Sequence, residues 1–310
     1  MLLCDLHRHL SGSISSHTVA KLLKCDQKDI RIAYSGNEKR TFHNFLDKFK
    51  IFEEIEWDRN ALNIALDQVC KDAKKEGLNY IEVKYTIHKY LKYGWSMKDI
   101  TCYIARKLYE YGRKHGIDVV PILAIKYDSS KAQQQKISRL IYDKDVFECV
   151  GGIDLVGDES QFDFGLYRGI LRDWSSKIVC AHVGETVDAY NVYHAIKLGV
   201  NRIAHGILAC DSKDIIDMAT SCDIPFDVAL TSNYYTGVVD NLNDHPIKRM
   251  LENGAIITIG TDDPCIFNTT ISDEYRILSE IGVSEHNINK IKMNSIKYAR
   301  IGFKYMPRCI

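Results

Sequence analysis

The sequence lacks a surplus of charge of either sign, and it lacks a long hydrophobic run. Lys plus Arg and Asp plus Glu both total 41, so the formal net charge is zero. A neutral chain gives no reason to expect a nucleic acid polymer or an anionic membrane as a partner. No stretch approaches the roughly eighteen uninterrupted apolar residues of a membrane-spanning helix, and Asp5 and His7 interrupt the first apolar stretch too early for a signal peptide. We therefore expect a cytoplasmic protein with a small-molecule partner.

The sequence also lacks closely paired cysteines, internal repeats, low-complexity segments and flexible linkers. Its ten cysteines lie far apart, with no Cys-x-x-Cys, and several lie inside apolar runs. A chain of 310 residues with 45% hydrophobic content can bury a large core without disulfide bonds. We expect mostly reduced cysteines and a single domain over residues 1–310, and the sequence does not indicate the oligomeric state.

The hydrophobic pattern alternates between the periods of strands and helices. Gly77, Gly116, Gly199 and Gly254 each stand where a helical segment ends and a strand begins. This alternation predicts an α/β fold, a (β/α)8 TIM barrel, and a doubly wound parallel sheet is the alternative. The eight predicted strands cover residues 2–9, 78–86, 117–124, 150–157, 178–185, 202–206, 224–230 and 255–261.

Local signals predict where several helices begin. Thr41 is placed to cap an amphipathic helix that carries aromatic residues as far as Phe52, and Asp58 is placed to cap the next helix. Residues 128–136 are polar enough to predict an exposed loop.

Polar side chains gather where predicted strands 1, 5, 6 and 8 end. Barrel enzymes keep their active sites at the C-terminal ends of the strands, and closing the barrel brings strand 8 beside strand 1. This placement favours the barrel over the doubly wound sheet. The seven side chains are His7, His9, His182, Glu185, His205, Asp262 and Asp263.

Four of these residues predict a metal site. His7 and His9 are two apart on a strand, so both imidazoles point to the same face. With His182 and Asp262 they would form a shell of three nitrogens and one oxygen, which suits one zinc ion with a position left open for water. Each signal alone has an ordinary explanation: hydrogen-bonded histidines, a satisfied core histidine, or a helix N-cap pair ahead of Pro264.

The other residues predict hydrolytic chemistry. A zinc ion lowers the pKa of its bound water to about 7 and supplies hydroxide at neutral pH. His205 would orient this water and stabilise charge, or would be a fourth imidazole ligand. Glu185, kept protonated, would donate a proton to a ring nitrogen, or would merely open the next helix. Asp263 would hold the water or a donor on the substrate.

Six motifs resemble those of the adenosine deaminase family, in the family's order and across nearly the whole chain. The resemblance implies a (β/α)8 barrel that removes the 6-amino group of a purine by hydrolysis, within purine and nucleotide metabolism. It also implies that one zinc ion is held by the four residues above. The motifs are His7-Arg-His-Leu-Ser-Gly12, Leu155-Val-Gly-Asp-Glu159, His182-Val-Gly-Glu185, Arg202-Ile-Ala-His-Gly206, Thr231-Ser-Asn233 and Thr261-Asp-Asp-Pro264.

The resemblance assigns roles to the remaining positions. Glu185 would protonate the ring nitrogen beside the attacked carbon, while His205 and Asp263 would position the water. Asp263 would also meet the imidazole side of the purine, and the backbone amide of Gly157 would contact its ring. An apolar helix over the pocket is matched by a segment that equally fits an ordinary core face, namely Phe42, Phe45, Leu46 and Phe49.

One departure from the family bears on the substrate. Adenosine deaminases typically have an aspartate that holds the ribose 5′ hydroxyl where this chain has Ser11. Residues 12–18 and 266–275 look more like the branch that deaminates N6-methyl-AMP, whereas residues 182–185 follow the nucleoside enzymes. We expect deamination of adenosine or 2′-deoxyadenosine to inosine or deoxyinosine, and the alternative is a 5′-modified or N6-modified adenine nucleotide.

Other classes of protein fit less well. A zinc hydrolase for another ring could use the same ligands, but such barrels commonly bridge two metals through a modified lysine, and Gly157 ends strand 4 here. A purine-binding protein without activity would usually have lost a ligand or the acid. Zinc deaminases that act on flipped bases carry a Pro-Cys-x-x-Cys signature, which this chain lacks.

Overall fold

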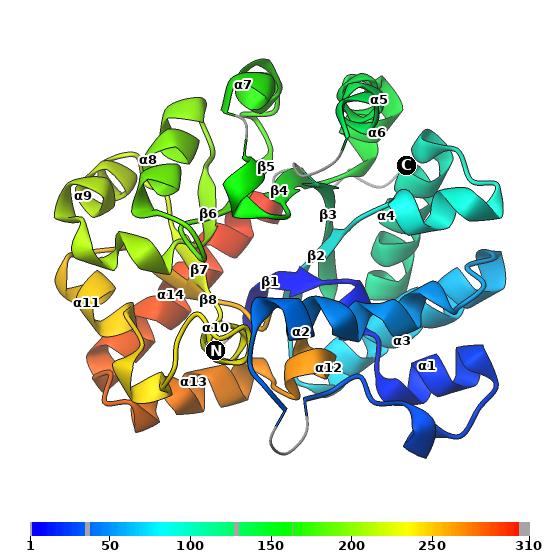
Figure 1. Ribbon diagram of the computed structural model, residues 1–310, viewed down its shortest axis with the longest axis horizontal. Coiled ribbons are helices and arrows are strands. Elements are labelled where there is room, and N and C mark those ends of the chain that lie inside the picture. The colour runs from blue at the N-terminus through cyan, green and yellow to red at the C-terminus, as the bar shows by residue number, and fades with distance from the viewer. Residues whose placement is uncertain (1, 35–37, 127–129, 163, 304–310) are drawn as a thin grey trace.

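Eight parallel strands form the centre of the computed structural model, which describes residues 2–34, 38–126, 130–162 and 164–303 (Figure 1). Each strand pairs with the next one along the chain, so the spatial order is the order in sequence. The strands are β1 (Cys4–His9), β2 (Tyr80–Tyr85), β3 (Asp118–Lys126), β4 (Gly152–Val156), β5 (Ile178–Val183), β6 (Arg202–His205), β7 (Phe226–Val228) and β8 (Ile257–Ile259).

The sheet closes at the junction between its first strand and the segment after its last. The amide of His9 donates to the carbonyl of Asp262 at 2.7 Å, and the amide of Asp262 donates to the carbonyl of His7 at 2.7 Å. Arg8 and Asp262 form a parallel bridge there. The prediction of a (β/α)8 barrel is confirmed, and the doubly wound alternative is wrong.

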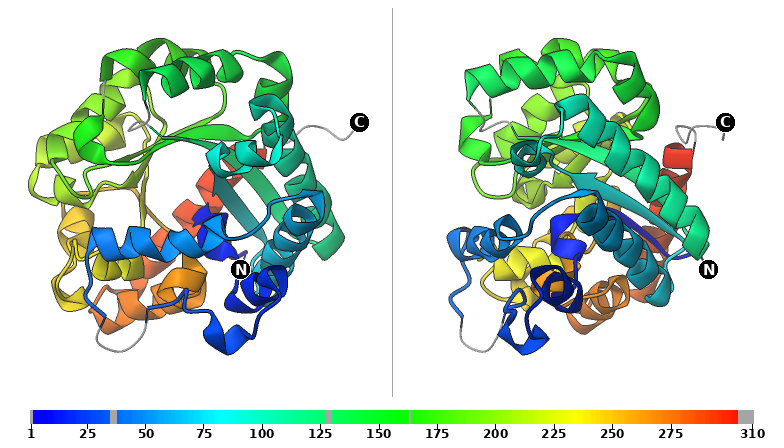
Figure 2. Two further views of the ribbon diagram at one scale, coloured as in Figure 1. Left: turned by 45° about the vertical axis from the view of Figure 1, so that its right-hand side comes forward. Right: turned by 90° about the vertical axis from the view of Figure 1, so that its right-hand side faces the viewer.

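Helices surround the strands, as the three ribbon views show (Figures 1 and 2). The principal outer helices are long and bury one face against the barrel; for example, Leu66 and Leu108 are fully buried. The helices are α1 (Ser16–Leu23), α2 (Phe42–Asp47), α3 (Arg59–Lys75), α4 (Met97–His115), α5 (Lys131–Ile141), α6 (Lys144–Cys149), α7 (Phe164–Asp173), α8 (Ala189–Leu198), α9 (Lys213–Ser221), α10 (Leu230–Tyr235), α11 (Ile247–Glu252), α12 (Pro264–Phe267), α13 (Ile271–Glu280) and α14 (Glu285–Phe303).

The predicted helix caps are present. The side chain of Asp58 accepts a hydrogen bond from the amide of Ala61 at 2.7 Å, and that of Thr41 accepts from Asn44 at 3.2 Å. Both bonds satisfy amides that a helix start would otherwise leave unpaired. Gly116 ends α4 in the left-handed conformation with φ of 69°, which glycine adopts without steric cost.

Two local predictions are wrong in part. The helix expected to run from Phe42 to Phe52 is α-helical only as far as Asp47, and the 3₁₀ helix η3 (Lys48–Glu53) continues it. The loop expected at 128–136 is helical from Lys131, because Ser130 and Gln133 form a capping box. Residues 128 and 129 lie outside the described residues.

Two further sequence expectations can be compared with the described residues. The nine described cysteines are all free, as expected for a chain with a large core. None of the described helices combines the length and the apolar content that crossing a membrane requires.

Candidate active site

Four predicted ligands meet at the C-terminal ends of β1, β5 and β8. His7, His9, His182 and Asp262 each offer one ligand atom, and these atoms all lie within 4.8 Å of one another. His182 lies between the other two histidines: its Nε2 atom is 3.1 Å from that of His7 and 3.2 Å from that of His9. Residues separated by more than 170 positions in sequence therefore converge on one point, as predicted.

The donor set fits a zinc ion. Asp262 Oδ1 lies 3.5 Å from His7 Nε2 and 3.3 Å from His9 Nε2. Ligands bound to zinc at about 2.0–2.1 Å in a tetrahedral shell would lie roughly 3.4 Å from one another. Four of the donor pairs, separated by 3.1, 3.2, 3.3 and 3.5 Å, lie close to that spacing. Three imidazoles with one carboxylate are ligands that zinc accepts.

Side chains behind the cluster orient its ligands. His182 Nδ1 donates to Asp154 Oδ1 at 3.2 Å, which directs Nε2 toward the cluster. Asp154 also pairs with Lys84 at 2.9 Å, and Ser232 Oγ donates to Asp262 Oδ2 at 2.7 Å. Sequence reasoning missed these three partners, although a carboxylate inside the apolar strand β4 is itself a signal.

Burial controls the charge of the cluster. It lowers the pKa of His9 to about 4 and of His205 to about 3, and it holds the pKa of His7 well below the usual range. Burial alone would raise the pKa of Asp262, but the hydrogen bond from His7 and the neighbouring imidazoles lower it well below the usual range. At neutral pH the imidazoles of His7, His9 and His205 are therefore neutral, and Asp262 is a carboxylate.

Glu185 lies beside this cluster as a buried acid. Its Oε2 atom is 3.6 Å from His205 Nε2, and Asn233 Nδ2 donates to its Oε1 at 3.4 Å. Burial, together with the charges of Asp262 and Glu159, raises its pKa well above the usual range. The alternative that Glu185 opens the next helix is wrong, because Asp188 caps α8.

His205 stands next to the cluster but outside the group of four. Its Nε2 atom is 4.0 Å from Asp262 Oδ2, and Asn233 Nδ2 lies 3.3 Å from its Nδ1. Donation from Asn233 leaves the proton of a neutral imidazole on Nε2, which faces Glu185 and Asp262. His205 and Asp262 both have positive φ, 59° and 60°, a backbone strain of about 1–3 kcal/mol each that concentrates at functional sites.

Asp263 is buried beside the cluster, and its side chain does not cap a helix. It occupies the N-cap position of α12, but its side chain makes no capping hydrogen bond. Its Oδ1 atom has no hydrogen-bond partner among the described residues. Burial and the charge of Asp262 raise its pKa well above the usual range. Gly12 makes the approach possible, because a Cβ atom there would lie 1.9 Å from Asp263 Oδ1.

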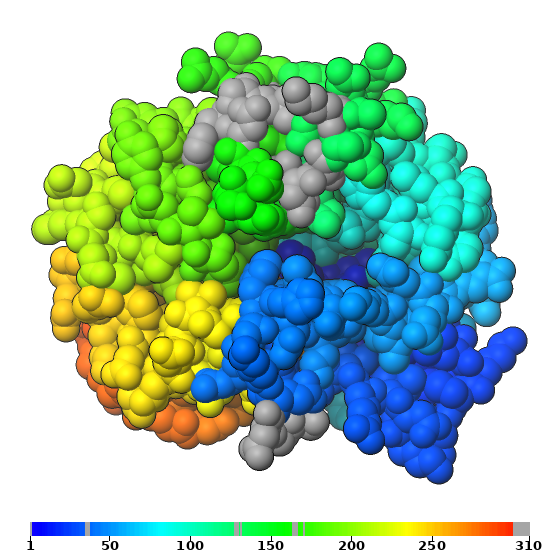
Figure 3. Space-filling view, viewed as in Figure 1, coloured from blue at the N-terminus to red at the C-terminus, as the bar shows by residue number. Residues whose placement is uncertain are grey.

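A cavity of about 760 Å³ opens over the cluster, within the size range of small-molecule sites. The opening lies beside α2 in Figure 3, with dark-blue atoms of the N-terminal part of the chain visible inside it. Every predicted substrate-contacting residue lines it: Ser11, Phe45, Leu46, Gly157 and Asp263.

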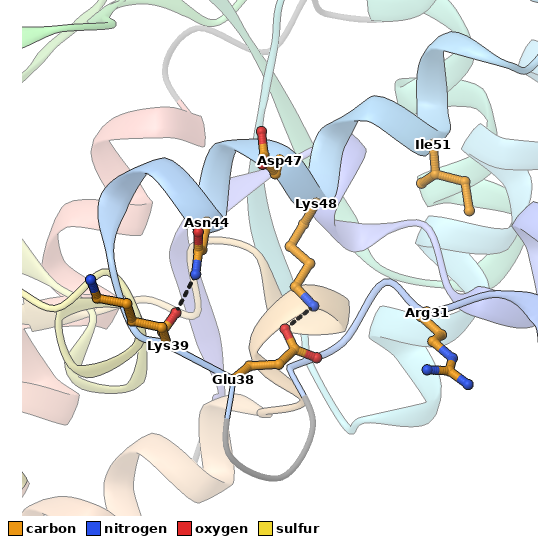
Figure 4. A pocket seen from close by; sticks show the side chains of 7 residues that line it. All are labelled: Arg31, Glu38, Lys39, Asn44, Asp47, Lys48 and Ile51. Carbon is orange, nitrogen blue, oxygen red and sulfur yellow. Dashed lines mark hydrogen bonds and ion pairs between the residues drawn. The ribbon is translucent and has the colours of Figure 1, made fainter.

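The aromatic segment over this cavity combines both predicted roles. Phe45 is buried, and its ring centre lies 5.2 Å from that of Phe49 and 5.3 Å from that of Phe267. It is therefore a core residue at the edge of the cavity. Leu46 is 49% exposed and lines the same cavity. Directly after α2, Lys48 of η3 pairs with Glu38 beside a second, smaller pocket of about 300 Å³ (Figure 4). That pocket contains none of the predicted site residues.

The loop that carries Glu185 is organised by Glu159. The carboxylate of this buried residue accepts hydrogen bonds from the amides of Glu185 at 3.1 Å, Thr186 at 2.9 Å and Val187 at 3.3 Å. The amide of Gly184 also donates to it. Four successive amides therefore point at one side chain, a role that the motif Leu155–Glu159 did not reveal in the sequence.

Comparisons with known proteins agree with this geometry. The adenosine deaminase of Edwardsiella ictaluri is 27% identical over 318 residues, covering 96% of this chain and 93% of that protein. An amidohydrolase from Burkholderia ambifaria with bound Zn has a TM-score of 0.83 at 20% identity, covering 96% of this chain and 85% of that one. An Arabidopsis N6-mAMP deaminase has a TM-score of 0.78 at 21% identity, covering 98% and 97%.

The two structural similarities concern the fold alone, since fewer than a quarter of the residues are identical in each. The family assignment has a broader basis. The family model for adenosine deaminase matches residues 3–307, a range that contains all seven polar residues at the strand ends. The chain belongs to the adenosine deaminase family, whose members are hydrolases that act on a purine amino group.

Proposed function

We propose that the protein catalyses the zinc-dependent hydrolytic deamination of a 6-aminopurine nucleoside. Its simplest substrates would be adenosine and 2′-deoxyadenosine, converted to inosine or deoxyinosine with release of ammonia. The observation that supports this proposal best is the meeting of three features in one cavity: a metal-binding cluster, the buried acid Glu185 with its raised pKa, and Asp263, whose Oδ1 has no hydrogen-bond partner among the described residues.

One zinc ion would be held by His7, His9, His182 and Asp262. When bound, zinc lowers the pKa of water to about 7 and so makes hydroxide available at neutral pH. Asp154 and Ser232 would keep two of the ligands in place, and such partners commonly contribute 10- to 100-fold to metal affinity.

Three residues would act directly on the reacting groups. Glu185, protonated because of burial, would donate its proton to the ring nitrogen beside the attacked carbon. His205 would present its Nε2 proton to the attacking oxygen and stabilise the negative charge on it. The free Oδ1 of Asp263 would accept a hydrogen bond from the water or from the purine.

The rest of the cavity would bind the purine and the sugar. Gly157 has φ of 128°, a conformation that side-chain-bearing residues rarely adopt, so its backbone can approach the purine ring closely. Phe45 and Leu46 would cover the apolar part of the substrate from α2. Ser11 would contact the sugar.

A second candidate is the same reaction on a 5′-modified or N6-modified adenine nucleotide, such as N6-methyl-AMP. The observation that favours it is at Ser11, whose Oγ accepts a hydrogen bond from Lys89 at 2.7 Å. A lysine beside a hydroxyl suits an anionic group better than a neutral sugar hydroxyl.

The proposed function can be tested by metal analysis together with a substrate panel. The protein should bind one zinc ion per chain, and it should release ammonia from one or more members of a panel of adenosine, 2′-deoxyadenosine, AMP, N6-methyl-AMP and adenine. His182→Ala should reduce the metal content, measured by elemental analysis, because it removes the donor that contacts both other histidines. Full zinc occupancy in that variant would show that the ligand set is wrong. Purine binding without ammonia release would indicate a binding protein.

A further inference from the structure

His245 is a buried histidine that lies outside the cavity. It follows the 3₁₀ helix η7 (Leu242–Asp244) and is only 2% exposed. Among the described residues that line the cavity over the metal cluster, neither His245 nor its partner Asn233 is present. Burial lowers the pKa of His245 to about 3, so the ring is neutral at neutral pH. Any influence of His245 on the reaction must therefore pass through another side chain.

A backbone amide determines which nitrogen of His245 carries the proton. The amide of Ile247 donates to His245 Nδ1 at 3.1 Å. Because a backbone N–H only donates, Nδ1 is the bare nitrogen, and the proton of the neutral ring is on Nε2. This Nε2 atom lies 3.2 Å from Asn233 Oδ1. His245 therefore donates a hydrogen bond to the carbonyl oxygen of the Asn233 side chain.

The bond from His245 fixes the orientation of the Asn233 side-chain amide. The two ends of such an amide have the same shape, so the neighbouring groups decide which end is the donor. With Oδ1 turned to His245, Nδ2 lies 3.3 Å from His205 Nδ1 and 3.4 Å from Glu185 Oε1. Turning the amide over would place Nδ2 against the N–H of His245, and two buried donors would then face each other without an acceptor.

This orientation places two protons of the active site. Asn233 donates to His205 Nδ1, so the proton of the neutral His205 ring is on Nε2. Asn233 also donates to Glu185 Oε1, so the proton of the Glu185 carboxyl group is on Oε2. With the amide reversed, His205 would carry its proton on Nδ1 and would present a bare nitrogen to the attacking oxygen.

We infer that His245 is a positioning residue for the deamination: by holding the amide of Asn233 in one orientation, it keeps the proton of the His205 ring on Nε2. The inference rests on the proposed function, in which that proton stabilises the attacking oxygen. The hydrogen bonds run from the amide of Ile247 through His245 and Asn233 to His205. Every side-chain nitrogen and oxygen of His245 and Asn233 takes part in them.

Two substitutions separate the two hydrogen bonds of His245. His245→Asn places an oxygen near the position of Nδ1, so it keeps the bond from Ile247 but is too short to reach Asn233. His245→Gln places an amide nitrogen near the position of Nε2 and still donates to Asn233. We expect His245→Asn to lower kcat by about 10- to 100-fold, the usual contribution of a partner that orients a functional imidazole in a metal site. KM should be unchanged, and His245→Gln should keep most of the activity.

The tautomer of His205 can be measured without turnover. ¹⁵N NMR of the zinc-loaded, histidine-labelled protein distinguishes a protonated ring nitrogen from a bare one, and His205→Gln identifies the signals of His205 by their loss. In the wild-type protein His205 should be protonated on Nε2. His245→Asn should populate the form protonated on Nδ1, and His245→Gln should not. A role of His245 in stability alone would lower the melting temperature without changing these signals.

Asn253→Ala is the matched control. It removes a partly buried side chain just after α11, whose hydrogen bond goes to the carbonyl of Cys210 at 2.9 Å. This variant should leave both kcat and the tautomer of His205 unchanged. If His245→Asn does not fold, His245→Phe takes its place, because it keeps a ring of similar volume and has no donor for Asn233.

The outcomes distinguish the inference from the proposed function. A wild-type His205 protonated on Nδ1, or a tautomer and a kcat that do not depend on His245, would overturn the positioning role and leave deamination intact. Absence of ammonia from every purine tested, with a His205 tautomer that still depends on His245, would overturn the proposed function and keep the positioning role.

Discussion

Buried carboxyl groups have different partners inside the barrel and at its C-terminal end. Inside, each carboxylate has a strongly basic partner: Arg202 pairs with Glu82 and lies 3.6 Å from Asp227, and Lys84 pairs with Asp154 at 2.9 Å. At the end of the strands, no Lys or Arg among the described residues pairs with Glu185, Asp262 or Asp263.

The difference separates structural charges from functional ones. A buried ion pair is satisfied within the protein and needs no further ligand. At the end of the barrel, Asp262 instead faces the imidazoles of His7, His9 and His205, whose pKa values are lowered, and burial raises the pKa of Glu185 and of Asp263 well above the usual range. A divalent cation would supply the missing positive charge at this end. Glu185, whose pKa is raised, would supply a proton for the reaction.

The largest expected effect is on activity. It concerns the C-terminal end of the barrel, where Glu185 has no Lys or Arg partner. Glu185→Gln should lower kcat by about 10²- to 10⁴-fold, the usual contribution of a general acid or base. Zinc content and melting temperature should stay close to wild type, because Glu185 is outside the ligand group and the neutral amide suits its buried position. Turnover close to normal in this variant would remove Glu185 from the mechanism.

The next effect is on stability. It concerns the inside of the barrel, where buried carboxylates have Lys or Arg partners. Arg202→Met should lower the free energy of unfolding by about 3–5 kcal/mol, because it leaves Glu82 and Asp227 buried without their partner. Chemical denaturation measures this loss. The matched control is Arg276→Met, which breaks exposed ion pairs on α13 and should leave the unfolding midpoint unchanged. An equal midpoint shift in both variants would contradict the distinction.

The strand-end residues could be predicted because their positions depend on local pattern. A period of two places His7 and His9 on one face, and the closing of a barrel brings the segment after β8 to β1. The partners behind the cluster could not be predicted in this way. Asp154 reaches His182 because β4 pairs with β5 in the register Asp154 with Cys180, and no signal within one segment specifies that register.

The helix errors have physical causes. A periodic aromatic pattern extends to Phe52, but the chain tightens into a 3₁₀ helix in which residues three apart lie on one side. Phe49 and Phe52 are three apart, and their ring centres lie 6.2 Å from each other. At the start of α5, polar composition concealed a helix, although the capping residues Ser130 and Gln133 were a legible start signal.

The smallest expected effect concerns the pH dependence of activity and the position of Glu159. Its charge is one of the causes that raise the pKa of Glu185, after burial and Asp262. Because the protonated form of Glu185 would be the active one, kcat should fall as pH rises through this pKa. Glu159→Gln removes a negative charge and therefore lowers the pKa of Glu185, so the alkaline limb of the kcat profile should move to lower pH.

A purely structural role for Glu159 would give a different profile. Loss of its hydrogen bonds to the amides of Glu185 and Thr186 would loosen the loop and reduce kcat at every pH without moving the limb. Asp158→Asn is the matched control: Asp158 is the adjacent, exposed acid, it lines the same cavity, and its side chain accepts from Ser160. If both variants shift the limb equally, the effect is one of general charge at the cavity mouth, and the buried position of Glu159 contributes nothing specific to the acidity of Glu185.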